Sequence, residues 1–374
     1  MKKVTLILPV LPHYRVDFLN ALSAKMAKDG DQLSVITGTN AGKKGIKESL
    51  DVSFTLIKNN TVGVGIKGFE IQWQKKLIRS IFKTKPDKVV LLYHAGKINY
   101  NILLLLLQLR GIPYVLWGSG TGDKRDDLSF LQRKLKAMFK FLFIRNSNAY
   151  LCYSTLFQKE LIAQNYPPER IFVAQNTINV EEIYSDETKD YSLRKYDYPR
   201  FLFVGVIFSK KRLDAAIKVC KRLVDQGLQF RFDIVGSGEY VAVLQQMVAD
   251  LSLEEYVRFH GAQYGKDLER YFLEANVFLL SGTGGLAINE AMAYSLPVIT
   301  TPGDGTAFDL IEEGENGFIL DFKYSLEMLE EKMKFFANSS DEQLRKMGDK
   351  SLEIIQQKAT LQNMVNQFTK SLNV

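Results

Sequence analysis

Residues 277–321 have the sequence VFLLSGTGGLAINEAMAYSLPVITTPGDGTAFDLIEEGENGFILD. An apolar run typical of a buried strand ends at Ser281, and the glycine-rich segment GTGG follows it at 282–285. A helical pattern begins near Leu286, and another apolar run covers 297–301. A strand, a glycine loop, a helix and a second strand in this order are typical of a parallel sheet whose crossovers are helices.

The same alternation extends over most of the chain. The first half carries strand-like runs at Val4–Pro9, Gln32–Thr37, Lys88–Tyr93, Tyr114–Trp117, Ala149–Tyr153 and Ile171–Ala174, and helical patterns near 15–28, 69–84, 97–110, 126–145 and 155–165. The second half carries strand-like runs at Phe201–Val206, Phe230–Val235, Val257–His260, Val277–Ser281, Pro297–Thr301 and Gly317–Leu320. Gly30 and Gly111 stand where helix C-caps are expected. The pattern predicts an α/β protein with two tandem Rossmann-like domains that face an interdomain cleft.

The domain boundaries follow from a break in this pattern. Residues 181–200 are polar, lack an apolar period and predict a linker. We expect an N-terminal domain at 1–180 and a second Rossmann-like domain at 201–354. The last helical pattern has no strand after it, and we expect a C-terminal helix at about 355–374 to pack on the N-terminal domain.

Charge divides the chain at the same place. Residues 1–180 hold 27 lysines and arginines against 12 aspartates and glutamates, whereas 181–374 hold 22 against 30. The basic residues of 75–85 and 128–145 alternate with large apolar ones, which is typical of helices that bind an anionic membrane surface. A packed helix with a solvated basic edge is the alternative. No helix-turn-helix, RNP or zinc pattern accompanies the charge, so we expect no nucleic-acid partner.

The cysteine content and the hydropathy of the chain indicate the cellular compartment of the protein. Two cysteines, Cys152 and Cys220, are too few for a disulfide framework and indicate a reducing compartment. The most apolar run, at 102–109, is far below the roughly 20 residues that a membrane-spanning helix needs. We therefore expect a cytoplasmic protein that is peripheral on the inner face of the cytoplasmic membrane.

The chemistry of the glycine loop has two interpretations. Glycines allow a ligand close to the backbone, and the helix that follows offers free N–H groups to phosphate oxygens. Glu290, one turn into that helix, could accept hydrogen bonds from a pair of sugar hydroxyls. The alternative is a tight turn with a glutamate favoured by the helix dipole.

This stretch resembles the nucleotide-binding signature of retaining family-4 glycosyltransferases, whose two Rossmann-like domains form the GT-B fold. Glu290-Ala291-Met292-Ala293 and Leu296-Pro297-Val298-Ile299 match that signature. Upstream, Phe203-Val204-Gly205 and Lys211 resemble the family's first strand and its phosphate-contacting lysine. The resemblance covers nearly all of 201–321 in order and spacing.

Three positions depart from the family pattern. Gly282 stands where the family has its first glutamate, Val206 replaces an arginine, and Ser295 replaces a glycine. The change at Gly282 leaves two alternatives: a variant loop that still holds the donor, or weak or lost activity. We favour the variant loop because Glu290 and Lys211 both remain.

The resemblance implies roles for individual residues of the second half. Glu290 would hold the nucleotide ribose and Lys211 the diphosphate, and both are candidate catalytic residues. Further candidates for contact with the nucleotide sugar are Gly205, Lys210, Arg212, Gly236, Gly261, Gly284, Gly285 and Leu286.

Candidates in the first half follow strand ends. His13 and Arg15, in a segment that resembles an HYR motif of some relatives, are candidate catalytic residues for an acceptor hydroxyl and the diphosphate. Candidates for the acceptor side are Tyr14, His94, Trp117 and Ser119. A helix-capping loop with a surface histidine is an equally good explanation of the HYR segment.

The resemblance implies a retaining glycosyltransferase of the hexosyltransferase type, which moves a sugar from a nucleotide-diphosphate donor without a metal. The acceptor would be a glycan or a polyprenyl-diphosphate-linked glycan in cell-surface polysaccharide or O-antigen assembly. No metal-ligand spacing of histidines or carboxylates is evident, and we expect no cofactor. The alternatives are a sugar-nucleotide epimerase of the same fold and a catalytically silent nucleotide-sugar-binding partner.

Overall fold

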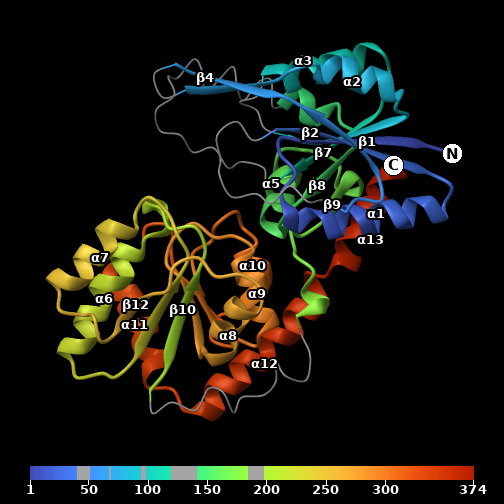
Figure 1. Cartoon of the computed structure of the whole chain (residues 1–374). Coiled ribbons are helices and arrows are strands. Elements are labelled where there is room, and N and C mark those ends of the chain that lie inside the picture. The colour runs from blue at the N-terminus through green and yellow to red at the C-terminus, as the bar shows by residue number, and fades with distance from the viewer. Residues whose placement is uncertain (40–50, 67–68, 94–97, 119–140, 184–197) are drawn as a thin grey trace. The chain divides into compact units, whose positions relative to one another are not determined.

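The computed structural model describes residues 1–39, 51–66, 69–93, 98–118, 141–183 and 198–374 (Figure 1). The chain forms two compact units, each with its own parallel sheet. Unit 1 comprises Met1–Ile178 and Leu361–Val374, and unit 2 comprises Asn179–Thr360. The predicted α/β architecture of two tandem Rossmann-like domains is confirmed.

Unit 1 is built on a parallel sheet in the order β3-β2-β1-β6-β7-β8-β9. Its strands are β1 Lys3–Leu8, β2 Gln32–Gly38, β3 Thr55–Asn59, β6 Lys88–Leu92, β7 Tyr114–Gly118, β8 Ala149–Cys152 and β9 Ile171–Val173, and a separate antiparallel pair is formed by β4 Thr61–Ile66 and β5 Phe69–Gln74. Its helices are α1 Val16–Lys28, α2 Leu77–Thr84, α3 Ile98–Leu109, α5 Thr155–Ala163 and α13 Leu361–Leu372, with short 3-10 turns η1 His13–Arg15 and η2 Pro168–Arg170.

The two faces of this sheet pack against different helices (Figure 1). Alternate side chains of β1 point to opposite faces, so Leu6 and Leu8 join α1 and α13 in one core while Ile7 joins α2, α3 and α5 in the other. A sheet buried on both faces explains why the strands of the first half have continuous apolar runs.

Helix α13 completes the first of these cores. Its apolar residues recur at helical spacing, and Phe368 packs against Phe18 and Trp117 with both ring centroids 4.7 Å away. The expected return of a C-terminal helix to the N-terminal domain is confirmed. The helix begins at Leu361 rather than at about 355, because a break at Ala359 separates it from the preceding helix.

Unit 2 has a parallel sheet in the order β12-β11-β10-β13-β14-β15. Its strands are β10 Arg200–Val204, β11 Arg231–Val235, β12 Val257–Phe259, β13 Val277–Leu280, β14 Val298–Thr300 and β15 Gly317–Ile319. Its helices are α6 Leu213–Asp225, α7 Val241–Asp250, α8 Lys266–Glu274, α9 Ala287–Ala293, α10 Ala307–Leu310, α11 Leu326–Ala337 and α12 Asp341–Lys358, with 3-10 turns η3 Val180–Glu182 and η6 Ser209–Lys211.

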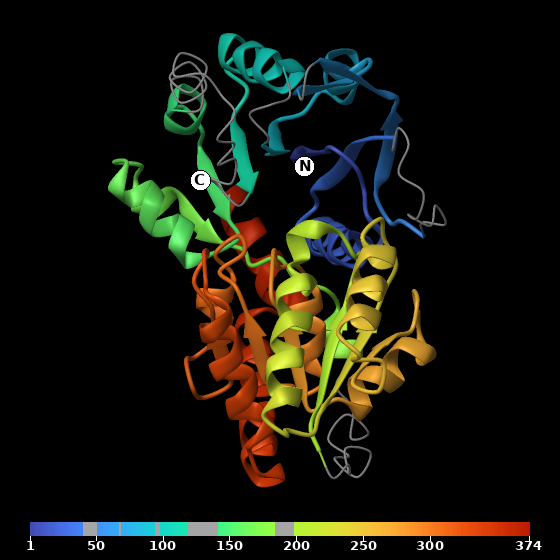
Figure 2. The same ribbon diagram turned by 90° about the vertical axis from the view of Figure 1, so that its left-hand side faces the viewer.

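The strand order of unit 2 reverses between β10 and β13. From β10 the chain proceeds to β11 and β12, and from β13 it proceeds in the opposite direction to β14 and β15. Figures 1 and 2 show α6 and α7 on one face of the sheet, and Figure 1 shows α9 and α12 on the other. Open α/β sheets bind ligands at such a reversal, outside the carboxyl ends of the strands. The loops after β10 and β13 therefore occupy the position where a site is expected.

Two predictions of local structure were wrong. Residues 69–74 were expected to be helical but form β5, because FEIQWQ alternates apolar and polar residues and pairs with β4. The expected linker at 181–200 is too long at both ends, since η3 belongs to unit 2 and β10 begins at Arg200. The C-cap prediction was right: Gly30 and Gly111 have φ values of 76° and 63°.

Candidate functional site

The loops after β10 and β13 are joined by direct hydrogen bonds. The Ser281 hydroxyl donates to the carbonyl of Arg212 (2.9 Å), and the Thr283 N–H donates to the carbonyl of Lys210 (3.0 Å). The ammonium of Lys211 donates in return to the carbonyl of Thr283 (2.8 Å). We call this contact between residues 209–212 and 281–283 the loop clasp. It holds Lys211 at the point where the strand order reverses.

Gly282 lies at the centre of the loop clasp. A Cβ atom there would lie 2.2 Å from the carbonyl oxygen of Lys210 and 2.5 Å from that of Lys211. Backbone atoms cannot move aside as the end of a flexible side chain can, so no other residue fits. The glutamate that the resembled family has at this position is therefore incompatible with this loop, and the clasp stands in its place.

Two side chains from other elements support the clasp. The Tyr324 hydroxyl donates to the carbonyl of Ser281 (2.6 Å), and the Thr301 hydroxyl donates to the carbonyl of Gly282 (2.6 Å). Arg212 has a left-handed backbone (φ 54°), and its guanidinium carbon lies 5.1 Å from the centre of the Tyr324 ring. A non-glycine residue in this conformation is strained unless its surroundings hold it, and such strain often accompanies functional loops.

The clasp gathers three cations in sequence. Burial partly desolvates the ammonium of Lys211 and lowers its pKa, and a bound anion would stabilise the charged form. Lys210 is exposed, and Arg212 lies 3.9 Å from the carboxylate of Asp214. Among the described residues, neither Lys210 nor Lys211 forms an ion pair with a carboxylate. Both therefore remain able to neutralise a diphosphate.

Glu290 lies in the first turn of α9, five residues after Gly285. Its carboxylate forms no hydrogen bond or ion pair with any described residue. Burial raises the pKa of Glu290 to about 7. An unpartnered, partly buried carboxylate of this kind is stabilised by a ligand that donates hydrogen bonds, as a pair of ribose hydroxyls does.

The glycine loop itself has free donors. Within the part of the chain that the structure describes, the N–H groups of Gly284, Gly285 and Leu286 donate no hydrogen bond to the protein. A Cβ atom on Gly285 would meet nothing within 4 Å, whereas Gly284 packs near the backbone of Gly303. The three amides are therefore available to an acceptor-rich ligand such as a phosphate, as the sequence predicted.

Three other glycines from the sequence analysis have a different role. The N–H of Gly205 donates to Val235, and the N–H of Gly236 donates to Gly261 (2.7 Å). A Cβ on Gly236 would lie 1.9 Å from the carbonyl oxygen of Gly205. Gly236 thus allows the ends of β10 and β11 to approach each other, and Gly205 and Gly236 have no free N–H for a ligand, whereas a Cβ on Gly261 would meet nothing within 4 Å.

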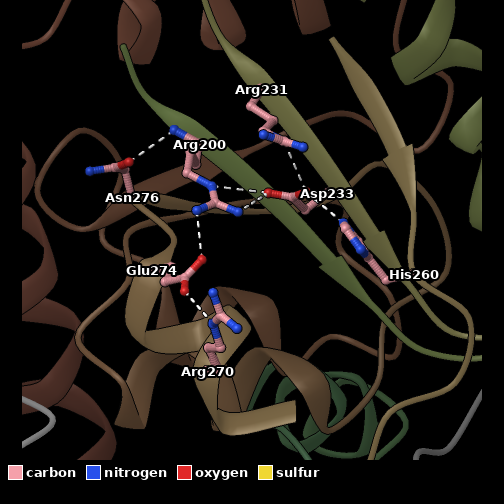
Figure 3. Close-up of polar contacts among 7 residues, drawn as sticks. All are labelled: Arg200, Arg231, Asp233, His260, Arg270, Glu274 and Asn276. Atoms are coloured by element: carbon pink, nitrogen blue, oxygen red, sulfur yellow. Dashed lines mark hydrogen bonds and ion pairs between the residues drawn. The ribbon is translucent and has the colours of Figure 1, made fainter. Parts of the chain in front are cut away.

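A network of charged side chains begins at the amino-terminal ends of β10 and β11 and extends to His260 after β12 (Figure 3). The Arg200 guanidinium donates to Asp233 (2.8 and 3.1 Å) and to Glu274 (2.7 Å), and its backbone N–H donates to Asn276. Asp233 also contacts the Nε2 atom of His260 at 2.7 Å. Burial alone would raise the pKa of Asp233, but the hydrogen bonds and charges of His260 and Arg200 hold it below its usual value.

The network is a structural one that sequence reasoning did not find. Arg231 lies 3.3 Å from Asp233, and Arg270 pairs with Glu274, so the contacts join β10, β11 and α8 to the loop after β12 (Figure 3). Its members are spread over 77 positions of the chain, from Arg200 to Asn276. No local spacing rule could reveal such a cluster. The network fixes His260, the residue before Gly261, at the strand end.

The candidates of unit 1 meet around the end of β1. His13 is exposed and Tyr14 is half-buried. Arg15 is buried, donates to the Tyr153 hydroxyl (2.7 Å) and stacks on Trp117, with 4.2 Å between its guanidinium carbon and the ring centre. The Trp117 side chain, an acceptor-side candidate, has no exposed surface in this structure. The apolar packing of the ring on Phe368 explains the burial.

Several expectations lie outside the described residues. His94 and Ser119 belong to this group, as does most of the basic helical pattern at 128–145. Among the described residues, no group of three or more His, Cys, Asp and Glu side chains could hold a metal ion. Cys152 and Cys220 are buried and unpaired. No helix of the described segments is both long and apolar enough to cross a bilayer.

Comparison with known families agrees with the division of the chain into two units. Residues 18–182 match the model of Glycosyltransferase Family 4, and residues 185–353 match that of Glycosyl transferases group 1. The chain belongs to these glycosyltransferase families. The loop clasp, Glu290 and the charged network all lie in the group 1 domain of this glycosyltransferase, and Arg15 precedes the matched part of its family 4 domain.

Two curated relatives match part of this glycosyltransferase. A segment of 175 residues is 33% identical to the amylovoran biosynthesis glycosyltransferase AmsK of Erwinia amylovora and covers 44% of this chain and 42% of AmsK. A segment of 185 residues is 28% identical to the putative colanic acid biosynthesis glycosyltransferase WcaL of Salmonella typhimurium and covers 47% of this chain and 44% of WcaL. The matched segments span less than half of either relative.

Solved structures extend the likeness to the whole chain. Anabaena HepE in complex with UDP is similar with a TM-score of 0.72 at 15% identity, and the match covers 100% of both chains. This likeness establishes the fold of the glycosyltransferase, which is GT-B.

Proposed function

We propose that this protein is a retaining glycosyltransferase of the hexosyltransferase type that takes a sugar from a nucleotide-diphosphate donor. One observation carries the proposal: unit 2 holds both Lys211, which the loop clasp fixes, and Glu290, whose carboxylate has no partner among the described residues. Both lie in the group 1 domain. The UDP in the HepE structure supports a nucleotide donor, and the resemblance to retaining family-4 enzymes supports retention.

In this proposal unit 2 stabilises the leaving diphosphate. Lys211 and Lys210 supply positive charge, and the N–H groups of Gly284, Gly285 and Leu286 supply oriented donors. Fixed cations and dipoles aimed at developing charge give most of the rate enhancement in many enzymes. Because these groups neutralise the diphosphate, the reaction proceeds without a metal. Activity that persists in the presence of a chelator is the test of this point.

Glu290 holds the nucleotide ribose. Its ionised carboxylate accepts two hydrogen bonds from adjacent hydroxyls, and each charge-assisted bond is stronger than a neutral one. Because its pKa is about 7, donor affinity depends on pH near neutrality. The variant Glu290→Ala should lose donor affinity and turnover, and full retention of both would refute the site.

The acceptor is a glycan or a polyprenyl-diphosphate-linked glycan in cell-surface polysaccharide assembly. The relatives AmsK and WcaL, a glycosyltransferase of amylovoran biosynthesis and a putative one of colanic acid biosynthesis, support this class. The exposed His13 and half-buried Tyr14 of unit 1 are the acceptor-side candidates that the structure leaves accessible.

A membrane location suits a lipid-linked acceptor, and α3 supports it. Ile102, Leu105 and Leu109 are exposed at spacings of three and four residues and form one apolar stripe. The Arg110 guanidinium lies 3.9 Å from the ring centre of Phe82 on α2, so α2 adjoins the end of the stripe. The basic side chains around α2 are exposed: Lys75, Lys76, Arg79, Lys83 and Lys85. Apolar residues beside exposed cations are typical of a surface that binds anionic lipid.

Two experiments test these assignments. Incubation with a panel of nucleotide sugars and an acceptor glycan should release nucleotide diphosphate and give a product whose anomeric configuration, read by NMR, is that of the donor. Isomerised donor would indicate an epimerase, and binding without turnover would indicate a silent partner.

The second experiment tests the membrane surface. The protein should sediment together with anionic liposomes at low salt, and the double variant Leu105→Glu, Leu109→Glu should stay in the supernatant. Equal sedimentation of the variant would refute the α3 surface.

A further inference from the structure

Arg15 is a buried cation without an anionic partner. Its side chain is only 5% exposed, and one of its terminal nitrogens, Nη2, donates to the neutral hydroxyl of Tyr153 at 2.7 Å. The other, Nη1, is buried and has no hydrogen-bond partner among the described residues. No carboxylate in the described segments pairs with this guanidinium. Burial of an unpaired charge costs several kcal/mol unless another group compensates it.

Trp117 adds a second unused donor beside it. The guanidinium carbon of Arg15 lies 4.2 Å from the centre of the Trp117 ring, so the two side chains stack. The indole Nε1 is buried and has no hydrogen-bond partner in the described part of the chain. Phe368 fixes the ring from α13, with 4.7 Å between ring centroids. The unused N–H groups of Arg15 and Trp117 therefore share one neighbourhood.

The place of this pair in unit 1 is that of a ligand site. Arg15 lies in the segment that follows β1, and Trp117 lies near the carboxyl end of β7 in the same sheet. Ligands of α/β sheets bind outside the carboxyl ends of the strands. The carboxyl edge of unit 1 thus carries two orphaned donors and one uncompensated positive charge.

Both unused groups are donors, and neither can accept a hydrogen bond. A sugar hydroxyl both donates and accepts, whereas a phosphoryl group offers only acceptor oxygens together with negative charge. We propose that Arg15 and Trp117 form a phosphoryl-binding site within unit 1. The inference rests on the proposed function, because it assigns to unit 1 a substrate that carries a phosphate or diphosphate.

Binding at this site requires movement of the segment that covers it. The Tyr14 ring lies 5.6 Å from the guanidinium carbon of Arg15, and the exposed His13 precedes it in the turn η1. Pro12, the residue before this turn, provides no side-chain cap. The turn opens to admit the phosphoryl group and closes over it, and the bound anion then compensates the Arg15 charge.

Tryptophan fluorescence can locate the binding. The chain has two tryptophans, Trp73 and Trp117, and Trp73 is partly exposed outside this cluster. In Trp73→Phe protein, the emission comes from Trp117 alone. Titration with inorganic diphosphate should give a saturable change in this emission, because the anion approaches the indole and its stacked cation. An emission that does not change over the titration would overturn the proposal.

Variants in a Lys211→Ala background isolate the site of unit 1. Calorimetric titration should show that Arg15→Gln weakens the affinity for inorganic diphosphate about tenfold to hundredfold, which is the range for hydrogen bonds to charged groups. Trp117→Phe removes the indole N–H together with part of the ring, so about a tenfold loss of affinity is expected, and circular dichroism of the variant without diphosphate checks that the fold is preserved. Unchanged affinity in both variants would refute the site.

Two sources of the phosphoryl group are distinguished by the choice of probe. If it belongs to a prenyl diphosphate acceptor, Arg15→Gln alone should weaken the binding of geranyl diphosphate, and Lys211→Ala alone should weaken that of the nucleoside diphosphate. If it belongs to the donor, both single variants weaken the nucleoside diphosphate. Either result supports the site. Loss of turnover in Glu290→Ala with undiminished diphosphate binding in Arg15→Gln would leave the proposed function intact and refute this inference.

Discussion

The variant Gly282→Ala tests the loop clasp most directly. A single methyl group at this position would lie 2.2–2.5 Å from backbone atoms of Lys210 and Lys211, where van der Waals contact begins at about 3.4 Å. The two loops must therefore separate by about 1 Å, which lengthens the hydrogen bonds of Thr283 to Lys210 and of Ser281 to Arg212 beyond normal range.

The magnitude follows from the bonds that are lost. Each hydrogen bond contributes about 0.5–1.5 kcal/mol net. Five hydrogen bonds join the two loops of the clasp, and the three shortest, at 2.8, 2.9 and 3.0 Å, account for most of the expected loss. We expect Gly282→Ala to lower the free energy of unfolding of unit 2 by about 2–4 kcal/mol and to abolish donor binding. The loss of binding follows because Lys211 is no longer held in place.

The same loop provides a matched control. A Cβ on Gly285 would meet nothing within 4 Å, so Gly285→Ala should change the free energy of unfolding by less than about 0.5 kcal/mol. Urea unfolding monitored by circular dichroism measures both variants, and calorimetric titration with a nucleoside diphosphate measures binding. If Gly282→Ala is as stable as Gly285→Ala and binds the nucleotide as wild type does, the clasp is not what holds the site.

Three further predictions concern other parts of the structure. Burial raises the folded-state pKa of Glu290 to about 7, so the free energy of unfolding should fall by on the order of 3 kcal/mol as pH rises from about 4.5 through 7. Donor affinity should rise over the upper part of the same range, because the ionised carboxylate is the form that binds. Glu290→Gln should remove both of these pH dependences, and a variant that keeps the wild-type profiles would contradict the assignment. Asp233→Asn removes the buried carboxylate 2.8 Å from Arg200 and leaves Glu274 as its ion-pair partner, and it should cost about 3 kcal/mol in urea unfolding. Glu327→Gln at the exposed Arg222 pair should change the free energy of unfolding little, and equal effects of the two variants would show that burial does not matter here. Phe368→Ala should cost about 3–5 kcal/mol and red-shift the Trp117 emission, because the cavity admits water to the ring, and unchanged emission would refute the packing argument.

Much of the fold could be predicted from the sequence because parallel strands are buried on both faces. Continuous apolar runs such as 114–117 and 149–153 therefore mark their positions directly. The hairpin at 61–74 was missed because a two-stranded ribbon outside the main sheet has only weak alternation to identify it. The division between units was placed a few residues late, because the polar segment that marks it includes part of unit 2.

The candidate site was predictable only where chemistry is local. Lys211, Glu290 and the glycine loop lie at fixed distances from strand ends, and the structure brings them to the strand reversal of unit 2. The consequence of Gly282 was not readable, since it depends on the carbonyls of residues more than 70 positions away. The burial of Trp117 was not readable for a similar reason: the residue that packs on it, Phe368, lies on the last helix.

The position of α13 also determines the order in which the protein can mature during synthesis. Phe368 covers Phe18 and Trp117, yet it leaves the ribosome only after all of Asn179–Thr360. At about 5–20 residues per second, translation of that intervening stretch takes roughly 10–40 s. For this interval the nascent first unit lacks the helix that covers Phe18 and Trp117, so this aromatic face is exposed to water. The unit that is made first is thus the last to be finished.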